Sequence, residues 1–224
     1  KRKRGAADAR PGGDTRTMRS LVCFLMLCGC APRLYTDASE DTSANSVWVA
    51  PENDWTLNEP PRGTVAEGFE EGQIPDDFRL VDQHGQEVSL WQFHDRWVVL
   101  DFSTLWCAPC QELAELAGET HELYADQGLE YLTLISQNLN YEPPSIAEIQ
   151  MWEDTFELET PVLADPLRTE GVEETLPSAW TANFVKGNAG FPHLAILGPD
   201  LRIVEKEVRP NNDAGLRAVL DALF

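Results

Sequence analysis

The fold is decided by the stretch Trp97-Val98-Val99-Leu100-Asp101-Phe102 and, after three intervening residues, Trp106-Cys107-Ala108-Pro109-Cys110. A short apolar run with turn signals on both sides is typical of a buried strand. A helical pattern begins at the cysteines, so they stand at a strand-to-helix junction. At a helix start, unpaired N–H groups and the helix dipole favour a thiolate, here on Cys107. The thiolate is the form that attacks disulfides.

Outward from this junction, strands and helices alternate, and a hairpin and a helix finish the chain. The helix that contains the cysteines shows an inward stripe at spacings of three and four residues, formed by Leu113, Leu116, Ala117, His121 and Tyr124. The predicted strands are 77–81, 87–90, 97–103, 130–136, 161–163, 191–197 and 202–208, and the predicted helices are 107–127, 144–156, 179–184 and 212–224. This order predicts an α/β fold with a central mixed sheet flanked by helices and an N-terminal strand pair.

The first thirty residues have the layout of an export signal. Arg19 precedes the apolar run 21–27, which is too short to span a bilayer and ends in Cys28-Gly29-Cys30. Residues 1–17 then form an upstream extension. The end of the run resembles the bacterial lipoprotein signal, which implies a lipid on Cys30 and, because Ala31 follows, an outer-membrane location. Ordinary signal cleavage is the alternative.

Residues 31–72 are polar and acidic and contain several prolines, and their apolar residues follow no sustained helical or strand period. We expect a largely disordered tether here, followed by one domain over residues 73–224. Trp48, Val49 and Trp55 are the exception, and docking onto the domain is an open alternative for them.

The chain has 224 residues and a formal net charge of −21. Seven of its seventeen basic residues precede Cys30, so signal cleavage would leave the protein still more acidic. Such a surface repels nucleic acids and anionic lipids. We therefore expect no nucleic-acid partner, and membrane contact only through the N-terminal anchor. A nucleic-acid-binding role for the basic residues 1–4 is the weaker alternative.

Three of the five cysteines lie in the signal region, so Cys107 and Cys110 are the pair that the domain keeps. A disulfide scaffold needs more cysteines, placed farther apart. A zinc site needs about four ligands, and no second such pair or paired histidines follow. The pattern thus favours a redox pair, with no metal or other cofactor. Copper(I) binding by the two cysteines and a histidine remains the alternative.

Residues 74–224 resemble the thioredoxin-like superfamily, and within it the exported TlpA/ResA-type thiol–disulfide oxidoreductases. The resemblance rests on the opening strand pair, the buried strand leading into Trp106-Cys107-Ala108-Pro109-Cys110, and the strand that opens with Phe191-Pro192. It implies that Cys107 attacks a substrate disulfide and that Cys110 resolves the mixed disulfide. It also implies protein dithiol or disulfide substrates, a periplasmic location and, for a reductant, a membrane electron donor.

The same resemblance implies that Asp101 relays the proton of Cys110. Strand alternation places Asp101 on one face with Val99 and Ser103, and a sheet covered on both faces would bury it. Burial raises the pKa of a carboxyl group, so that it can exchange protons near neutral pH. An outward-facing Asp101 is the alternative.

Around the cysteines, Trp106, Pro109, Phe191 and Pro192 are the expected substrate-binding residues. Trp106 would shield the thiolate, and simple packing is its alternative role. Phe191-Pro192 resembles the family's cis-proline dipeptide, which offers backbone to an extended substrate. Because Phe191 is bulkier than the usual residue, we expect it to narrow access. His193 is expected to be structural.

Two positions depart from the family pattern. Leu113 and Glu115 stand where a Glu and a Pro are common, so we expect an unkinked helix. The segment 165–190 is longer than usual, and a lid is one interpretation of it. A peroxidase is not favoured, because the Pro-x-x-x-Thr-x-x-Cys setting of a peroxidatic cysteine is absent.

Overall fold

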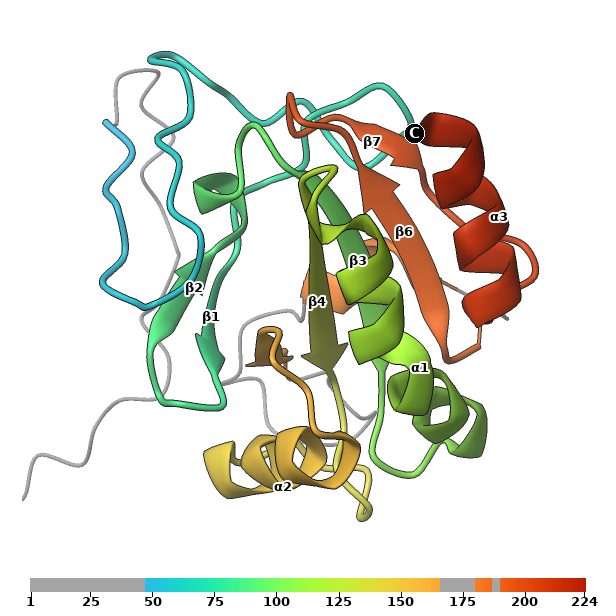
Figure 1. Cartoon of the computed structure of the whole chain (residues 1–224). Coiled ribbons are helices and arrows are strands. Elements are labelled where there is room, and N and C mark those ends of the chain that lie inside the picture. The colour runs from blue at the N-terminus through green and yellow to red at the C-terminus, as the bar shows by residue number, and fades with distance from the viewer. Residues whose placement is uncertain (1–46, 166–179, 187–189) are drawn as a thin grey trace, which may run out of the picture. The chain divides into compact units, whose positions relative to one another are not determined.

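The computed structural model describes residues 47–165, 180–186 and 190–224 (Figure 1). Cys30 and the export signal, residues 31–46 and most of the segment 165–190 lie outside the described residues. The elements are β1 (Arg79–Asp82), β2 (Glu87–Ser89), η1 (Leu90–Gln92), β3 (Trp97–Ser103), α1 (Ala108–Ala125), β4 (Leu129–Ile135), α2 (Ile146–Phe156), β5 (Val162–Ala164), η2 (Trp180–Asn183), β6 (His193–Leu197), β7 (Ile203–Glu205) and α3 (Asp213–Leu223).

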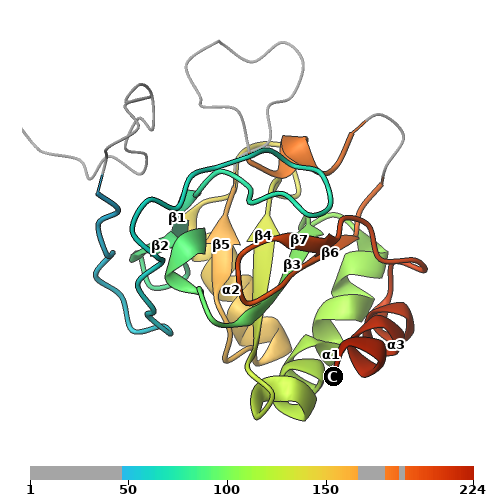
Figure 2. The same ribbon diagram turned by 90° about the horizontal axis from the view of Figure 1, so that it is seen from above.

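The strands form one seven-stranded mixed sheet in the order β2-β1-β5-β4-β3-β6-β7, which confirms the predicted fold class (Figure 2). β3 and β4 run parallel in the middle and pair over seven residues, from Trp97 opposite Leu129 to Ser103 opposite Ile135. β5 continues the parallel part, whereas β1 and β6 pair antiparallel with their neighbours. The predicted N-terminal strand pair is the hairpin of β1 and β2.

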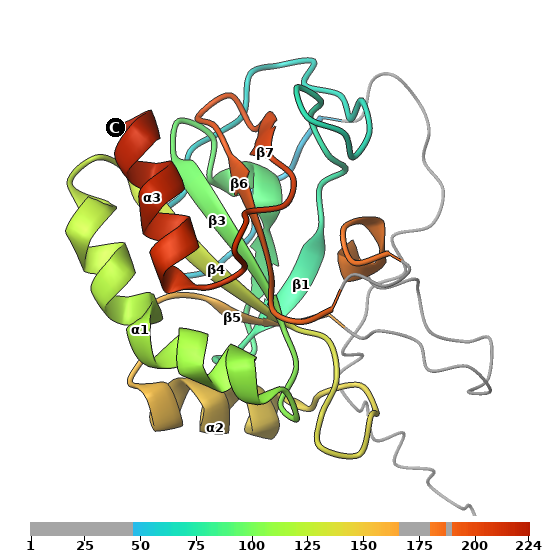
Figure 3. The ribbon, with the colours of Figure 1, turned by 90° about the vertical axis from the view of Figure 1, so that its right-hand side faces the viewer.

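The two faces of the sheet are covered differently (Figure 3). All three α-helices pack on one face, where buried side chains such as Leu113, Ile149 and Leu216 share one core cluster. The opposite face is covered by η1, η2 and aromatic side chains such as Trp180 and Phe184. Both faces of the sheet are therefore shielded from solvent, as expected, although the α-helices flank only one of them. Within the described residues, no helix combines the length and hydrophobicity that crossing a membrane requires.

The inward stripe of α1 differs in part from the prediction. Leu113, Ala117 and Tyr124 are buried as expected, but Leu116 is 39% exposed. Ala114, which the predicted stripe did not include, is buried instead. Thr120 is likewise buried and hydrogen-bonded to Asp213 at the start of α3.

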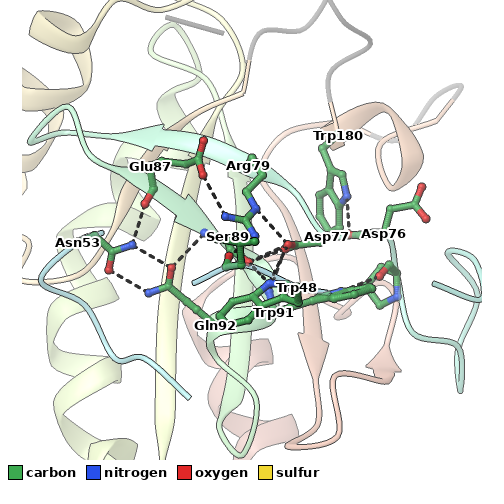
Figure 4. A network of polar contacts seen from close by, with 12 residues as sticks. Trp48, Asn53, Asp76, Asp77, Arg79, Glu87, Ser89, Trp91, Gln92 and Trp180 are labelled. Atoms are coloured by element: carbon green, nitrogen blue, oxygen red, sulfur yellow. Dashed lines mark hydrogen bonds and ion pairs between the residues drawn. The ribbon is translucent and has the colours of Figure 1, made fainter. Parts of the chain in front are cut away.

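Residues 47–72 are more ordered than the expected tether, because buried polar groups of the domain bind them (Figure 4). The indole of Trp48 donates to Asp77 at 3.2 Å and to Ser89 at 3.1 Å. The indole of Trp55 donates to Asp82, which is fully buried, at 2.7 Å. Val49 remains 69% exposed. The side chains of the two tryptophans thus dock on the domain, whereas Val49 is held only through its carbonyl, which accepts a hydrogen bond from Arg79 at 2.6 Å.

Candidate redox site at the start of the first helix

The site lies where β3 and β4 end side by side. Ser136 donates its backbone N–H to the carbonyl of Ser103 at 3.0 Å, and Leu105 donates to the carbonyl of Gln137 at 3.0 Å. These bonds extend the pairing of the two strands beyond the sheet. They hold the loop that delivers Cys107 to the start of α1.

Cys107 is the N-cap residue of α1, and it forms a disulfide with Cys110 one turn further on, with 5.2 Å between the Cα atoms. The backbone N–H of Cys110 points at Cys107 Sγ at 3.3 Å. When the disulfide is reduced, this N–H and the helix dipole stabilise a thiolate at Cys107. Cys107 is 4% exposed and Cys110 is fully buried, so Cys107 is the more accessible sulfur, as predicted.

Asp101 lies inside the protein, and the alternative of an outward-facing carboxylate is wrong. It is fully buried and accepts hydrogen bonds from Ser103 Oγ at 2.7 Å and from the Tyr131 hydroxyl at 3.3 Å. Burial raises the pKa of Asp101 to about 7, although both hydrogen bonds oppose this shift. The carboxyl group is therefore able to take up and release a proton near neutral pH.

Tyr131 is a site residue that the sequence analysis missed. It is fully buried on β4, opposite Val99, and belongs to the same core cluster as Cys107 and Cys110. Burial, with the neighbouring Asp101, raises the pKa of Tyr131 well above its usual value. Its hydroxyl therefore remains a hydrogen-bond donor. A signal was available, because β4 pairs with β3 and alternation places Tyr131 on the face that carries Asp101.

Trp106 lies at the surface beside the disulfide, with 37% of its area exposed. Its indole donates to Gln137 Oε1 at 3.1 Å. Its ring centroid lies 5.2 Å from that of Tyr141 and 6.1 Å from that of Phe191, in an edge-on arrangement with Phe191. Trp106 is thus held in place from two sides while part of its ring stays open to a partner.

The other expected substrate-binding residues are found close to the same edge of the sheet. Pro109 is exposed in the first turn of α1. The peptide bond between Phe191 and Pro192 is cis, as the resemblance implied. Pro192 is buried, and Phe191 is half-buried with its ring against Trp106.

His193 lies on the opposite face of the sheet, between the rings of Phe102 and Phe184. Its Nε2 lies 3.0 Å from the carbonyl of Lys206, and burial lowers its pKa. This agrees with the expected structural role. Within the described ranges, no group of three His, Cys, Asp or Glu side chains is arranged to hold a metal ion.

The structure also places Leu113 and Glu115, the two residues of α1 that depart from the family pattern. Leu113 is buried in the core and Glu115 is exposed. α1 is assigned as one helix through both positions, and the absence of a kink stays a prediction.

Comparison with known proteins gives the family. The model of the AhpC/TSA family matches residues 72–191, which is more than half of the chain. This chain belongs to the AhpC/TSA family. The matched AhpC/TSA region contains the candidate site from Asp101 through the cysteines to Phe191 and ends one residue before Pro192.

Two curated relatives are each similar to part of this AhpC/TSA chain. Thioredoxin-like protein YneN of Bacillus subtilis is 30% identical over 98 residues, which are 44% of this chain and 55% of that protein. Thiol-disulfide oxidoreductase ResA of Geobacillus thermodenitrificans is 29% identical over 94 residues, 42% of this chain and 51% of that protein. The chain thus spans about half the length of these relatives.

Solved structures show that the fold is thioredoxin-like. The thioredoxin domain of a thiol-disulfide oxidoreductase from Bacteroides vulgatus has a TM-score of 0.53 at 18% identity, covering 69% of this chain and 97% of that one. A thiol:disulfide interchange protein from Bacteroides sp. has a TM-score of 0.50 at 18% identity, and the match covers 69% of this chain and 90% of that one. The predicted thioredoxin-like fold is confirmed.

Proposed function

We propose that this AhpC/TSA protein is an exported thiol–disulfide oxidoreductase that exchanges the Cys107–Cys110 disulfide with protein dithiols. The observation that carries the proposal is the disulfide at the first turn of α1, with the fully buried Asp101 on the same face of the sheet. The names of the relatives support the same chemistry.

We propose that the protein works as a reductant, in two steps. The Cys107 thiolate attacks a substrate disulfide, forms a mixed disulfide and expels one substrate thiolate. Asp101 takes the proton of Cys110, whose thiolate then attacks Cys107 Sγ and expels the second substrate sulfur. Two electrons pass to the substrate, and the protein is left with the Cys107–Cys110 disulfide.

Each cycle of this kind needs two electrons and two protons from a donor. We propose a membrane protein as that donor, because an oxidising periplasm supplies no reductant of its own. A lipid on Cys30 would anchor the domain on the periplasmic side of the outer membrane. The lipoprotein-like sequence from Leu27 to Cys30, followed by Ala31, supports this location.

Cysteine substitutions test the oxidoreductase proposal in a disulfide-reduction assay with insulin as substrate. We expect Cys107→Ser to abolish turnover and Cys110→Ser to accumulate a mixed disulfide with substrate. Leu123→Ser, an exposed position near the far end of α1, is the control for surface substitutions. A wild-type protein that exchanges disulfides with no dithiol would refute the proposal.

Copper(I) binding through the same cysteines is the second candidate function. An anaerobic copper(I) titration of the reduced protein against a competing chelator tests it. Stoichiometric tight binding without disulfide exchange would favour this candidate. Mass spectrometry of the N-terminus tests the anchor, since an unmodified residue at position 30 or beyond rejects lipidation.

A further inference from the structure

We infer that the loop after β4, through Leu139 and Tyr141, forms one wall of a docking surface for client segments in which an aromatic or aliphatic side chain flanks the reacting cysteine. This inference rests on the proposed function and names the class of substrate that the site accepts. Its occupant is a segment of a client protein, because the surface is continuous with the Cys107–Cys110 disulfide.

The first observation is the exposure of apolar side chains in this loop. Leu139 is 62% exposed, Tyr141 is 54% exposed, and neighbouring Trp106 is 37% exposed. The rings of Tyr141 and Trp106 lie 5.2 Å apart, so they form one continuous apolar surface. Exposed apolar groups that gather in one place mark an interaction site, whereas single ones are ordinary.

The second observation is that this loop is held in a fixed shape. Asn138 Oδ1 accepts the backbone N–H groups of Asn140 at 2.9 Å and of Glu142 at 3.0 Å. The backbone N–H of Asn138 in turn donates to the carbonyl of Glu142 at 2.8 Å. Such a turn presents its side chains without the loss of entropy that ordering a flexible loop on binding would cost.

The third observation is the backbone of Tyr141, whose φ of 63° lies in the left-handed region. A bulky residue is rarely found there, and Asn or Gly would be accommodated with less strain. The strained conformation places a large aromatic side chain at the surface, beside Trp106. Asp95, Glu157 and Leu201 also have positive φ, but Tyr141 is the one of these four residues whose ring lies against Trp106, next to Cys107.

The loop is also tied to the reacting sulfur. Gln137 accepts the indole N–H of Trp106 through its side chain and the N–H of Leu105 through its carbonyl. Leu105 and Trp106 lead directly into Cys107. A client sulfur that reaches Cys107 therefore brings its flanking side chains over Trp106 and toward Tyr141.

The charge of the surroundings adds a second preference. Glu112, two residues after Cys110, and Glu142, next to Tyr141, are exposed, and the whole chain has a formal net charge of −21. Opposite charge accelerates association, and salt screens this effect. The preferred client segment is thus apolar beside its cysteine and basic farther away.

The test uses two lysine-flanked peptides, each with one cysteine disulfide-bonded to glutathione, that differ only in a Trp or a Ser next to the cysteine. The reduced protein is the reductant, and kcat/KM is measured for both. We expect wild type to prefer the Trp peptide about tenfold, which is typical of burying one aromatic side chain at an interface. Because a change in the reactivity of Cys107 affects both peptides equally, it does not change the ratio of the two kcat/KM values.

Three variants test whether the preference for the Trp peptide comes from this loop. Tyr141→Asn removes the ring but suits the left-handed backbone, and we expect it to reduce the Trp-to-Ser ratio of kcat/KM to about twofold. Leu139→Ser should also lower this ratio. Tyr141→Phe should restore the wild-type ratio. The control Leu123→Ser removes an equally exposed leucine, 53% exposed, from the far end of α1.

The outcomes separate the two proposals. Equal rates for both peptides in wild type, or an unchanged ratio in Tyr141→Asn, would overturn the docking surface while leaving the oxidoreductase activity in place. If the fully reduced wild-type protein reduces insulin but neither peptide, the docking surface alone fails; if it reduces none of the three, the proposed function fails as well.

Discussion

The hydroxyl of Tyr131 donates a hydrogen bond of 3.3 Å to the carboxylate of Asp101, and both side chains are fully buried. The two residues lie on the adjacent parallel strands β3 and β4. Together with Ser103, Tyr131 partly compensates the carboxylate for its loss of water, so the pKa of Asp101 comes to lie near 7. This balance makes Asp101 suited to proton transfer at physiological pH.

Asp101→Asn should slow disulfide exchange above neutral pH. The carboxyl group acts as a base only when ionised, so the wild-type rate should rise as the pH passes about 7. The variant has no such base, and we expect its rate at pH 8 to be lower by about tenfold or more. Rapid-mixing measurements of thiol oxidation from pH 5 to 9 test this. Superimposable pH profiles would show that Asp101 is not the relay.

The same substitution should change how stability depends on pH. The folded protein binds the Asp101 proton more tightly than the unfolded chain, because the pKa is raised from 3.8 to about 7. Proton binding by Asp101 therefore contributes fully to the free energy of unfolding below about pH 4, and this contribution is lost as the pH rises to 7. The contribution is about 4 kcal/mol at most.

Urea unfolding of the oxidised wild type and of Asp101→Asn at several pH values measures this effect. We expect wild type to lose stability relative to the variant between pH 4 and pH 7. Comparison of the two proteins isolates Asp101 from Asp77 and Asp165, whose pKa values are also raised by burial. Parallel stability curves would contradict a raised pKa at Asp101.

Tyr131→Phe should raise the pKa of Asp101 further, because it removes a hydrogen bond to the charged form. The midpoint of the pH–rate profile should then move upward by about half a unit to one unit. Tyr124→Phe is the matched control, since Tyr124 also donates to a carboxylate, Asp221, but between α1 and α3. An equal shift in both variants would mean that the effect is not specific to Asp101.

Trp55→Phe should loosen the N-terminal segment from the domain. The change removes the 2.7 Å hydrogen bond to the fully buried Asp82 and keeps most of the apolar area. We expect a loss of about 1 kcal/mol in the free energy of unfolding. Val49→Ala, at a 69% exposed position of the same segment, should lower the free energy of unfolding by no more than a few tenths of a kcal/mol. Similar losses in both variants would argue against the docked tryptophan.

Two helical glycines should respond oppositely to alanine. A Cβ at Gly215 would meet the carbonyl oxygen of Pro210 at 2.0 Å, so Gly215→Ala must displace the start of α3 and should cost about 1–3 kcal/mol. A Cβ at Gly118 in α1 would meet nothing within 4 Å. Gly118→Ala should therefore stabilise the protein by up to about 1 kcal/mol, through helix propensity alone. Thermal unfolding of both variants measures the difference.

The amino-acid sequence by itself was sufficient for the class of fold and for the reacting pair. Local periodicity placed β3 at Trp97–Ser103 without error and most other elements within a few residues. It also placed Asp101 on the face that proved to be buried. Such inferences succeed because strand alternation, helix starts and cysteine spacing are properties of neighbouring residues.

Contacts between distant segments were decided only by the tertiary structure. Tyr131 reaches Asp101 because β4 pairs with β3 in one register, and Tyr141 meets Trp106 because Asn138 closes the loop after β4. The docking of Trp48 and Trp55 depends likewise on partners far away in the chain. Periodicity identifies which side of an element is apolar, but packing decides what that side meets.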